Sequence, residues 1–70
     1  MVTLQELMEI TAVDHLTVYA PGDDGTRERL DVYTEAEGQL ARLIETHGQR
    51  EVKTVWPMYK GDVRMVVEVK

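Results

Sequence analysis

The sequence predicts one α+β domain in which two helices cover one face of an antiparallel four-stranded sheet built from two hairpins. Three observations support this prediction: two helix-start motifs followed by helically spaced apolar residues, four segments with alternating polarity, and turn residues inside each pair of such segments. A chain of 70 residues is long enough for a single domain, here 1–70. The expected order of elements is αββαββ.

The first helix is expected to begin after Thr3. Residues 3–6 form a capping box, because the Thr3 hydroxyl can accept a hydrogen bond from the Glu6 amide while the Glu6 carboxylate accepts one from the Thr3 amide. One side of this helix carries Leu4, Leu7, Met8 and Thr11. That stripe predicts a buried side, and we expect the helix to end near Val13.

The first hairpin is expected over residues 15–33. Residues 15–20 alternate apolar and polar side chains, and residues 21–25 (Pro-Gly-Asp-Asp-Gly) are typical of a chain reversal. In the returning strand, Leu30 and Val32 are expected on the covered face of the sheet, and Asp31 and Tyr33 on its open face.

The second helix is expected to start at a second capping box, residues 34–37. Its buried stripe would comprise Leu40, Leu43, Ile44 and His47. Gly48 follows the last of these residues and is interpreted as a left-handed C-cap.

The last hairpin is expected over residues 51–59 and 63–70. A two-residue loop at Lys60-Gly61 turns Trp56 toward the helices and places Val55 opposite Val66 on the open face. Pro57 cannot donate a ladder hydrogen bond, so its strand should be an edge or carry a bulge.

The open face of the predicted sheet is the expected interaction surface. Tyrosines are enriched where proteins meet partners, and a small core favours self-association. We therefore predict a homodimer or larger homo-oligomer that associates through this face. The alternative explanation for the tyrosines is that they favour half-exposed strand positions whether or not a partner binds. The residues predicted to form the surface are Tyr19, Tyr33, Val55, Tyr59 and Val66.

Single-stranded nucleic acid is the alternative occupant of the same face. Aromatic side chains on an open sheet can stack on bases, and nearby cations can bind phosphates. The residues predicted for this role are Lys53, Tyr59, Lys60 and Arg64. The net charge of −5 opposes tight general binding to phosphates, although residues 50–70 carry five basic and three acidic side chains.

Catalysis, metal binding and a cofactor are not expected. Asp23 and Asp24 are interpreted as turn residues, His47 as a helix C-terminal residue and His15 as a strand residue without a nucleophile beside it. No cysteine is present, and the longest apolar run is far shorter than the ~20 residues that span a bilayer. The absence of a signal-peptide pattern predicts a cytoplasmic protein.

Four segments carry a resemblance that covers most of the chain: residues 3–8 (TLQELM), 16–19 (LTVY), 47–52 (HGQREV) and 66–69 (VVEV). Together they resemble short uncharacterised proteins of phages and mobile elements of Firmicutes, some of which are anti-CRISPR proteins. The resemblance implies a non-enzymatic inhibitor or interaction protein that acts in a bacterial host, with a host defence protein as a further partner. It transfers no functional residue.

Overall fold

The computed structural model describes residues 1–34, 38–59 and 61–70. The expected order of elements is confirmed. The elements are α1 (Leu4–Glu9), β1 (His15–Pro21), β2 (Arg27–Thr34), α2 (Leu40–His47), β3 (Val52–Tyr59) and β4 (Val63–Val69).

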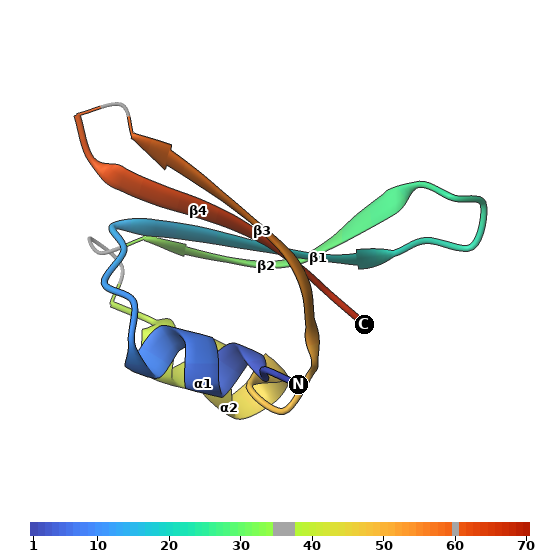
Figure 1. The fold of residues 1–70 in the computed structure, drawn as a ribbon, viewed down its shortest axis with the longest axis horizontal. Helices are drawn as coiled ribbons and strands as arrows, with labels where there is room; N and C mark the ends of the chain where they lie inside the picture. Colours follow the sequence, from blue (N-terminus) through green and yellow to red (C-terminus); the bar gives the residue numbers. More distant parts are fainter. Residues whose placement is uncertain (35–37, 60) are drawn as a thin grey trace.

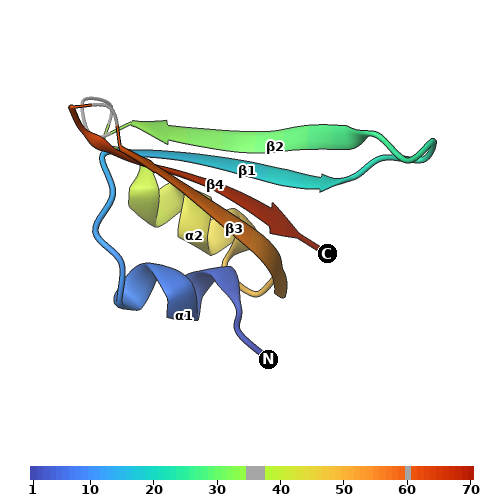
Figure 2. The same ribbon diagram turned by 45° about the horizontal axis from the view of Figure 1, so that its top comes forward.

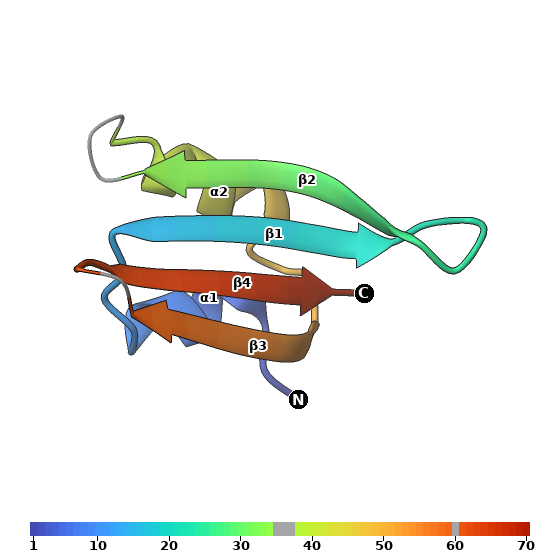
Figure 3. The same ribbon diagram turned by 90° about the horizontal axis from the view of Figure 1, so that it is seen from above.

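The four strands form one mixed sheet in the order β2-β1-β4-β3 (Figure 3). Both hairpins are antiparallel, as expected, but they join through a parallel pairing of β1 with β4. The prediction of a purely antiparallel sheet is therefore wrong. Local sequence patterns specify each hairpin, whereas the joining of the two hairpins depends on contacts between residues about fifty positions apart.

The two helices lie side by side on one face of the sheet and leave the other face open (Figures 1 and 2). The core fills the space between the layers; its buried side chains come from the other five elements, and β3 adds the partly buried Val52 and Val55. The buried cluster consists of Leu4, Leu16, Val18, Tyr33, Leu43, Met65, Val67 and Val69. The predicted covered faces of β1 and α2 are confirmed by Leu16, Val18 and Leu43.

The N-terminus of α1 is fixed by its capping box and by the loop before β3. The predicted reciprocal bonds between Thr3 and Glu6 are present. The amides of Leu4 and Gln5 donate to the carbonyls of Arg50 and Gly48 at 3.0 and 2.9 Å. These bonds satisfy amides that a helix leaves without an internal partner. The helix ends at Glu9, earlier than the predicted Val13.

The second helix begins later than predicted. Thr34 is the last residue of β2, and α2 starts at Leu40 after the N-cap Gln39. Gly38 has a φ of 63°, a left-handed value that interrupts a right-handed helix. The predicted helix start at Thr34 is therefore wrong, while residues 35–37 of the expected capping box lie outside the described residues.

Gly48 does not adopt the predicted left-handed conformation. Its φ and ψ are −59° and −27°, which are right-handed helical values. The position requires glycine for a different reason: a Cβ atom there would lie 2.3 Å from the carbonyl oxygen of Ile44. Close approach of the backbone, and not backbone handedness, explains this glycine.

A bulge in β2 reverses the predicted orientation of its last residues. Val18 pairs with Asp31 and Tyr19 with Arg29, so Leu30 has no partner in β1. Tyr33 pairs with Leu16 and lies in the core, 9% exposed. The prediction of Tyr33 on the open face is wrong, because an extra residue in one strand shifts the alternation beyond it.

The β3–β4 hairpin has a register that differs by one residue from the predicted one. Tyr59 pairs with Val63, so three residues separate the strands instead of two. Trp56 therefore pairs with Val66 on the open face, and Val55 pairs with the buried Val67 on the covered face. Both predicted orientations are wrong for this reason. The expectation that β3 is an edge strand is confirmed.

Candidate interaction face

The open face of the sheet is organised in rows that cross the strands. The central row follows from the pairings of β2 with β1, β1 with β4, and β4 with β3. It consists of Val32, Thr17, Val66 and Trp56. The neighbouring rows add Tyr19 on one side and Met58 on the other. Apolar and aromatic side chains thus run across the full width of the sheet.

Among the described residues, four basic side chains lie on this face. They are Arg27, Arg29, Lys53 and Arg64. Among the strand residues of this face, Glu68 is the acidic one. The strand residues of this face are thus mainly basic, whereas the chain as a whole has a net charge of −5.

Glu68 lies beneath two of these cations. Its side chain is only 9% exposed, and it sits on the open face because the flanking Val67 and Val69 point into the core. Its Oε2 lies 3.2 Å from Nε of Arg27, and its Oε1 lies 3.4 Å from Nζ of Lys53. These two cationic neighbours offset part of the free-energy cost of burying a carboxylate.

Arg27 also covers the aromatic ring of Trp56. Its guanidinium carbon lies 4.5 Å from the ring centroid, within the range of a cation–π interaction. Arg27 comes from the edge strand β2 and reaches Glu68 in β4 and Trp56 in β3. The β1–β2 hairpin extends beyond the end of β4, and the beginning of β2 bends away from the helices (Figures 1 and 3). Bulges such as the one at Leu30 increase strand bending and twist.

The structure brings together only part of the predicted interaction surface. Tyr19 and Val66 lie on the open face as predicted. Tyr33 and Val55 pack with the core. Tyr59 follows Met58 on the opposite side of β3, near the strand end, and is 75% exposed.

For the predicted nucleic-acid residues, Lys53 and Arg64 lie on the open face, each beside a carboxylate, and Tyr59 does not. Lys60 lies outside the described residues. The predicted interaction surface did not include Trp56, Arg27 and Glu68, which meet in space from three strands. The available signal for Glu68 was an acidic residue between Val67 and Val69 in a mainly apolar strand.

A polar cluster ends the open face near the β3–β4 turn. The guanidinium of Arg64 bonds Asp62, with Nε to Oδ1 at 2.8 Å, and His15 Nε2 lies 3.0 Å from Asp62 Oδ2. The hydrogen bond from Arg64 lowers the pKa of Asp62, and Asp62 in turn raises the pKa of Arg64. Asp14 fixes the adjacent backbone by accepting from the Val63 amide at 2.8 Å.

The two histidines occupy different environments. His15 is at the polar cluster, while His47 lies at the end of α2 with Nε2 3.6 Å from Oδ2 of Asp31. The buried Nδ1 of His47 has no hydrogen-bond partner in the described structure. Within residues 1–34, 38–59 and 61–70, no group of three or more histidines and carboxylates is placed to hold a metal ion.

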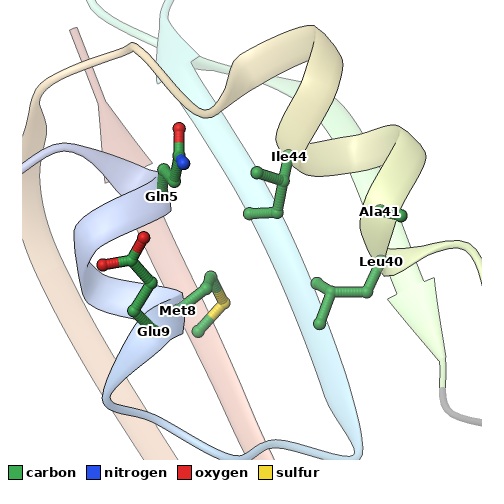
Figure 4. A pocket seen from close by; sticks show the side chains of 6 residues that line it. All are labelled: Gln5, Met8, Glu9, Leu40, Ala41 and Ile44. Atoms are coloured by element: carbon green, nitrogen blue, oxygen red, sulfur yellow. The ribbon is translucent and has the colours of Figure 1, made fainter.

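The helix layer carries a separate groove between α1 and α2 (Figure 4). Its volume is about 440 Å³. It is lined by Gln5, Met8, Glu9, Leu40, Ala41 and Ile44. Met8, Leu40 and Ile44 also pack against the core, so the apolar floor of this groove contributes to the joining of the two layers.

No family model, curated protein or solved structure matches this chain. In the described residues, neither helix has the length and apolar character needed to cross a membrane.

Proposed function

We propose that this protein is a non-enzymatic interaction protein that self-associates through the open face of its sheet. The observation that carries the proposal is the central row across all four strands, which no helix covers and in which three of the four members, Val32, Val66 and Trp56, are apolar or aromatic. Val32 and Met58 at the two edges of the face are 38% and 44% exposed. Apolar surface of this kind gains free energy when a partner removes it from water.

The charges around the row are compatible with a second copy. Arg27 and Lys53 contact Glu68, and Arg64 contacts Asp62, so three of the four cations already have an anionic neighbour in the same chain. Repulsion between two such faces is therefore reduced. The limited core of a 70-residue chain supplies a further reason for association, since small domains often gain stability in this way.

Sedimentation velocity over a range of micromolar concentrations tests the proposal. We expect a mass above that of the 8.0 kDa monomer, and we expect Met58→Glu to weaken association by about tenfold or more, or ~1.4 kcal/mol, because it places a charge in the interface. Tyr59→Glu is the matched control, because Tyr59 is the next residue but points to the opposite side. A monomer at every concentration would contradict self-association.

Single-stranded nucleic acid remains the second candidate partner, favoured by one observation. Tyr19 and Trp56 share the open face with four basic side chains, and aromatic stacking together with phosphate contacts is how open sheets bind single strands. The competing observation is that Arg27 already occupies one face of the Trp56 ring.

Fluorescence of Trp56, the one tryptophan in the chain, tests this second candidate. Stacking of a base should quench the emission when a single-stranded oligonucleotide is added at low salt, and the affinity should fall as salt rises. Arg29→Ala should reduce both the affinity and its salt dependence. Unchanged emission at low salt would eliminate nucleic acid as the partner.

The resemblance to phage and mobile-element proteins supports a further proposal about context, namely inhibition of a host defence protein. Co-purification from a bacterial host that carries such a system tests it, with Met58→Glu and Tyr59→Glu as paired baits. A partner that the first bait loses and the second retains would place inhibition on the open face. A partner retained equally by both would contradict that placement.

A further inference from the structure

We propose that Trp56 and Glu68 form a receptor site for a guanidinium group, which Arg27 fills and which an arginine of a partner protein can enter. The inference goes beyond the proposed self-association, because binding of a guanidinium needs no second copy of the chain. The site lies in the open face, and its ligand class is an arginine side chain.

The site has two walls that suit a planar cation. The Trp56 ring lies 4.5 Å from the guanidinium carbon, and the Glu68 Oε2 lies 3.2 Å from Nε. A guanidinium is planar and weakly hydrated, so it can stack on an aromatic ring and bond a carboxylate at the same time. An ammonium ion has no plane with which to stack.

The geometry also permits exchange of the occupant. The side chain of Arg27 is 55% exposed, whereas that of Glu68 is 9% exposed, so the receptor is more enclosed than its ligand. Arg27 belongs to the part of β2 that pairs with Pro21, near the hairpin end. If Arg27 leaves, Lys53 still lies 3.4 Å from Oε1 of Glu68, and the buried carboxylate keeps one cationic partner.

Charge selects a protein partner over a polyanion at this position. The negative group in the site is Glu68, and a phosphate beside it would meet repulsion and displace its cations. An arginine on a partner surface would replace Arg27 charge for charge. The released Arg27 would then be available for a carboxylate of the same partner. The partner would thus present an arginine to Glu68 and a carboxylate to Arg27.

The first experiment removes the resident side chain and adds methylguanidinium as the probe. In Arg27→Ala, we expect a saturable change in Trp56 fluorescence. We expect wild type to bind about tenfold more weakly if Arg27 fills the site ~90% of the time. Methylammonium at equal ionic strength should give a much smaller response. Arg29→Ala is the matched control, since Arg29 lies on the same strand and pairs with Tyr19, and it should behave as wild type.

A second variant keeps the test decisive if Arg27→Ala does not fold. Arg27→Lys retains a cation beside Glu68 but removes the planar group, and it should also bind methylguanidinium more tightly than wild type. Adding Glu68→Gln to the variant that folds should abolish the response. Equal responses in wild type, the Arg27 variant and Arg29→Ala, or no response in the Arg27 variant, would overturn the proposal.

The measurement is made at concentrations where sedimentation shows the monomer mass of 8.0 kDa for every variant, so that no second copy covers the open face. A failure of self-association therefore leaves the guanidinium result unaffected, and the reverse also holds. For wild type, a nitrogen-15 NMR titration with N-acetyl-arginine amide gives an independent readout. The Arg27 Nε–H and Trp56 indole N–H signals should both shift as the added side chain replaces Arg27, and shifts in neither signal would count against exchange.

Discussion

The effect of a charged substitution at Tyr33 depends on which side of the sheet its side chain lies. It pairs with Leu16 and is 9% exposed, so its replacement by a charged residue would bury an unpaired carboxylate. We expect Tyr33→Asp to unfold the protein or lower its free energy of unfolding by more than about 3 kcal/mol. Circular dichroism during urea unfolding measures this.

Tyr59→Asp provides the comparison for that prediction. The Tyr59 side chain is 75% exposed, so a charge there remains in water. Its effect on the free energy of unfolding should stay within about 0.5 kcal/mol. If Tyr33→Asp instead left folding intact and only reduced the molecular mass of an oligomer, Tyr33 would have to lie on the open face.

Asp62 offers a pH-dependent prediction. Its pKa is lowered from 3.8, chiefly by the hydrogen bond from Arg64. A lowered folded-state pKa contributes stability above the unfolded-state value and loses that contribution as the pH falls below about 3.8 through the folded-state pKa. Arg64→Ala should raise the pKa of Asp62 toward its ordinary value, measured by carboxyl carbon NMR.

Asp24 is a suitable internal reference in that titration. Its pKa is also lowered, but by hydrogen bonds from Thr26 in a turn remote from Arg64 along the chain. Arg64→Ala should therefore leave the titration of Asp24 unchanged. Identical shifts of both carboxyls would indicate a global change in charge or folding and not the loss of one contact.

At the scale of elements, the end of α2 depends on the absence of a side chain at Gly48. Because a Cβ atom would lie 2.3 Å from the Ile44 carbonyl oxygen, Gly48→Ala must displace the backbone. We expect a loss of about 1–3 kcal/mol in the free energy of unfolding. Glu45→Ala on the exposed side of the same helix is the control and should change the free energy of unfolding little, whereas a gain in stability from Gly48→Ala would show that helix propensity decides.

The type and order of the helices and strands were predicted more accurately than the side of the sheet on which individual side chains lie. Capping residues and alternation are local signals, and they located α1, β1 and the apolar stripe of α2. One extra residue at Leu30 and one extra residue in the β3–β4 loop each reversed a face. The first moved Tyr33 into the core, and the second exchanged Trp56 with Val55.

The candidate site was predictable only in part for the same reason. Tyr19 and Val66 belong to strands whose alternation is uninterrupted across the face, and their orientation was predicted correctly. The meeting of Arg27, Trp56 and Glu68 requires the bend of β2 together with the parallel pairing of β1 and β4. Both features depend on contacts across the sheet that no local pattern contains.

At the scale of the whole molecule, the two central strands should be the most persistent part of the fold. Leu16, Val18, Val67 and Val69 are fully buried, and β1 and β4 have neighbours on both sides. Native-state hydrogen exchange should show the slowest amides in these strands and the fastest around residues 22–26. Equal protection of all four strands would contradict a stability gradient from centre to edge.

The parallel pairing of β1 with β4 also affects the order in which parts of the fold can form. Each hairpin can form soon after its residues leave the ribosome, but the core closes only when residues 63–69 reach β1, whose residues were made about fifty positions earlier. Until then, the apolar sides of β1 and of both helices have no central partner strand. We therefore expect the pairing of β1 with β4, and not the formation of either hairpin, to be the step that completes the hydrophobic core.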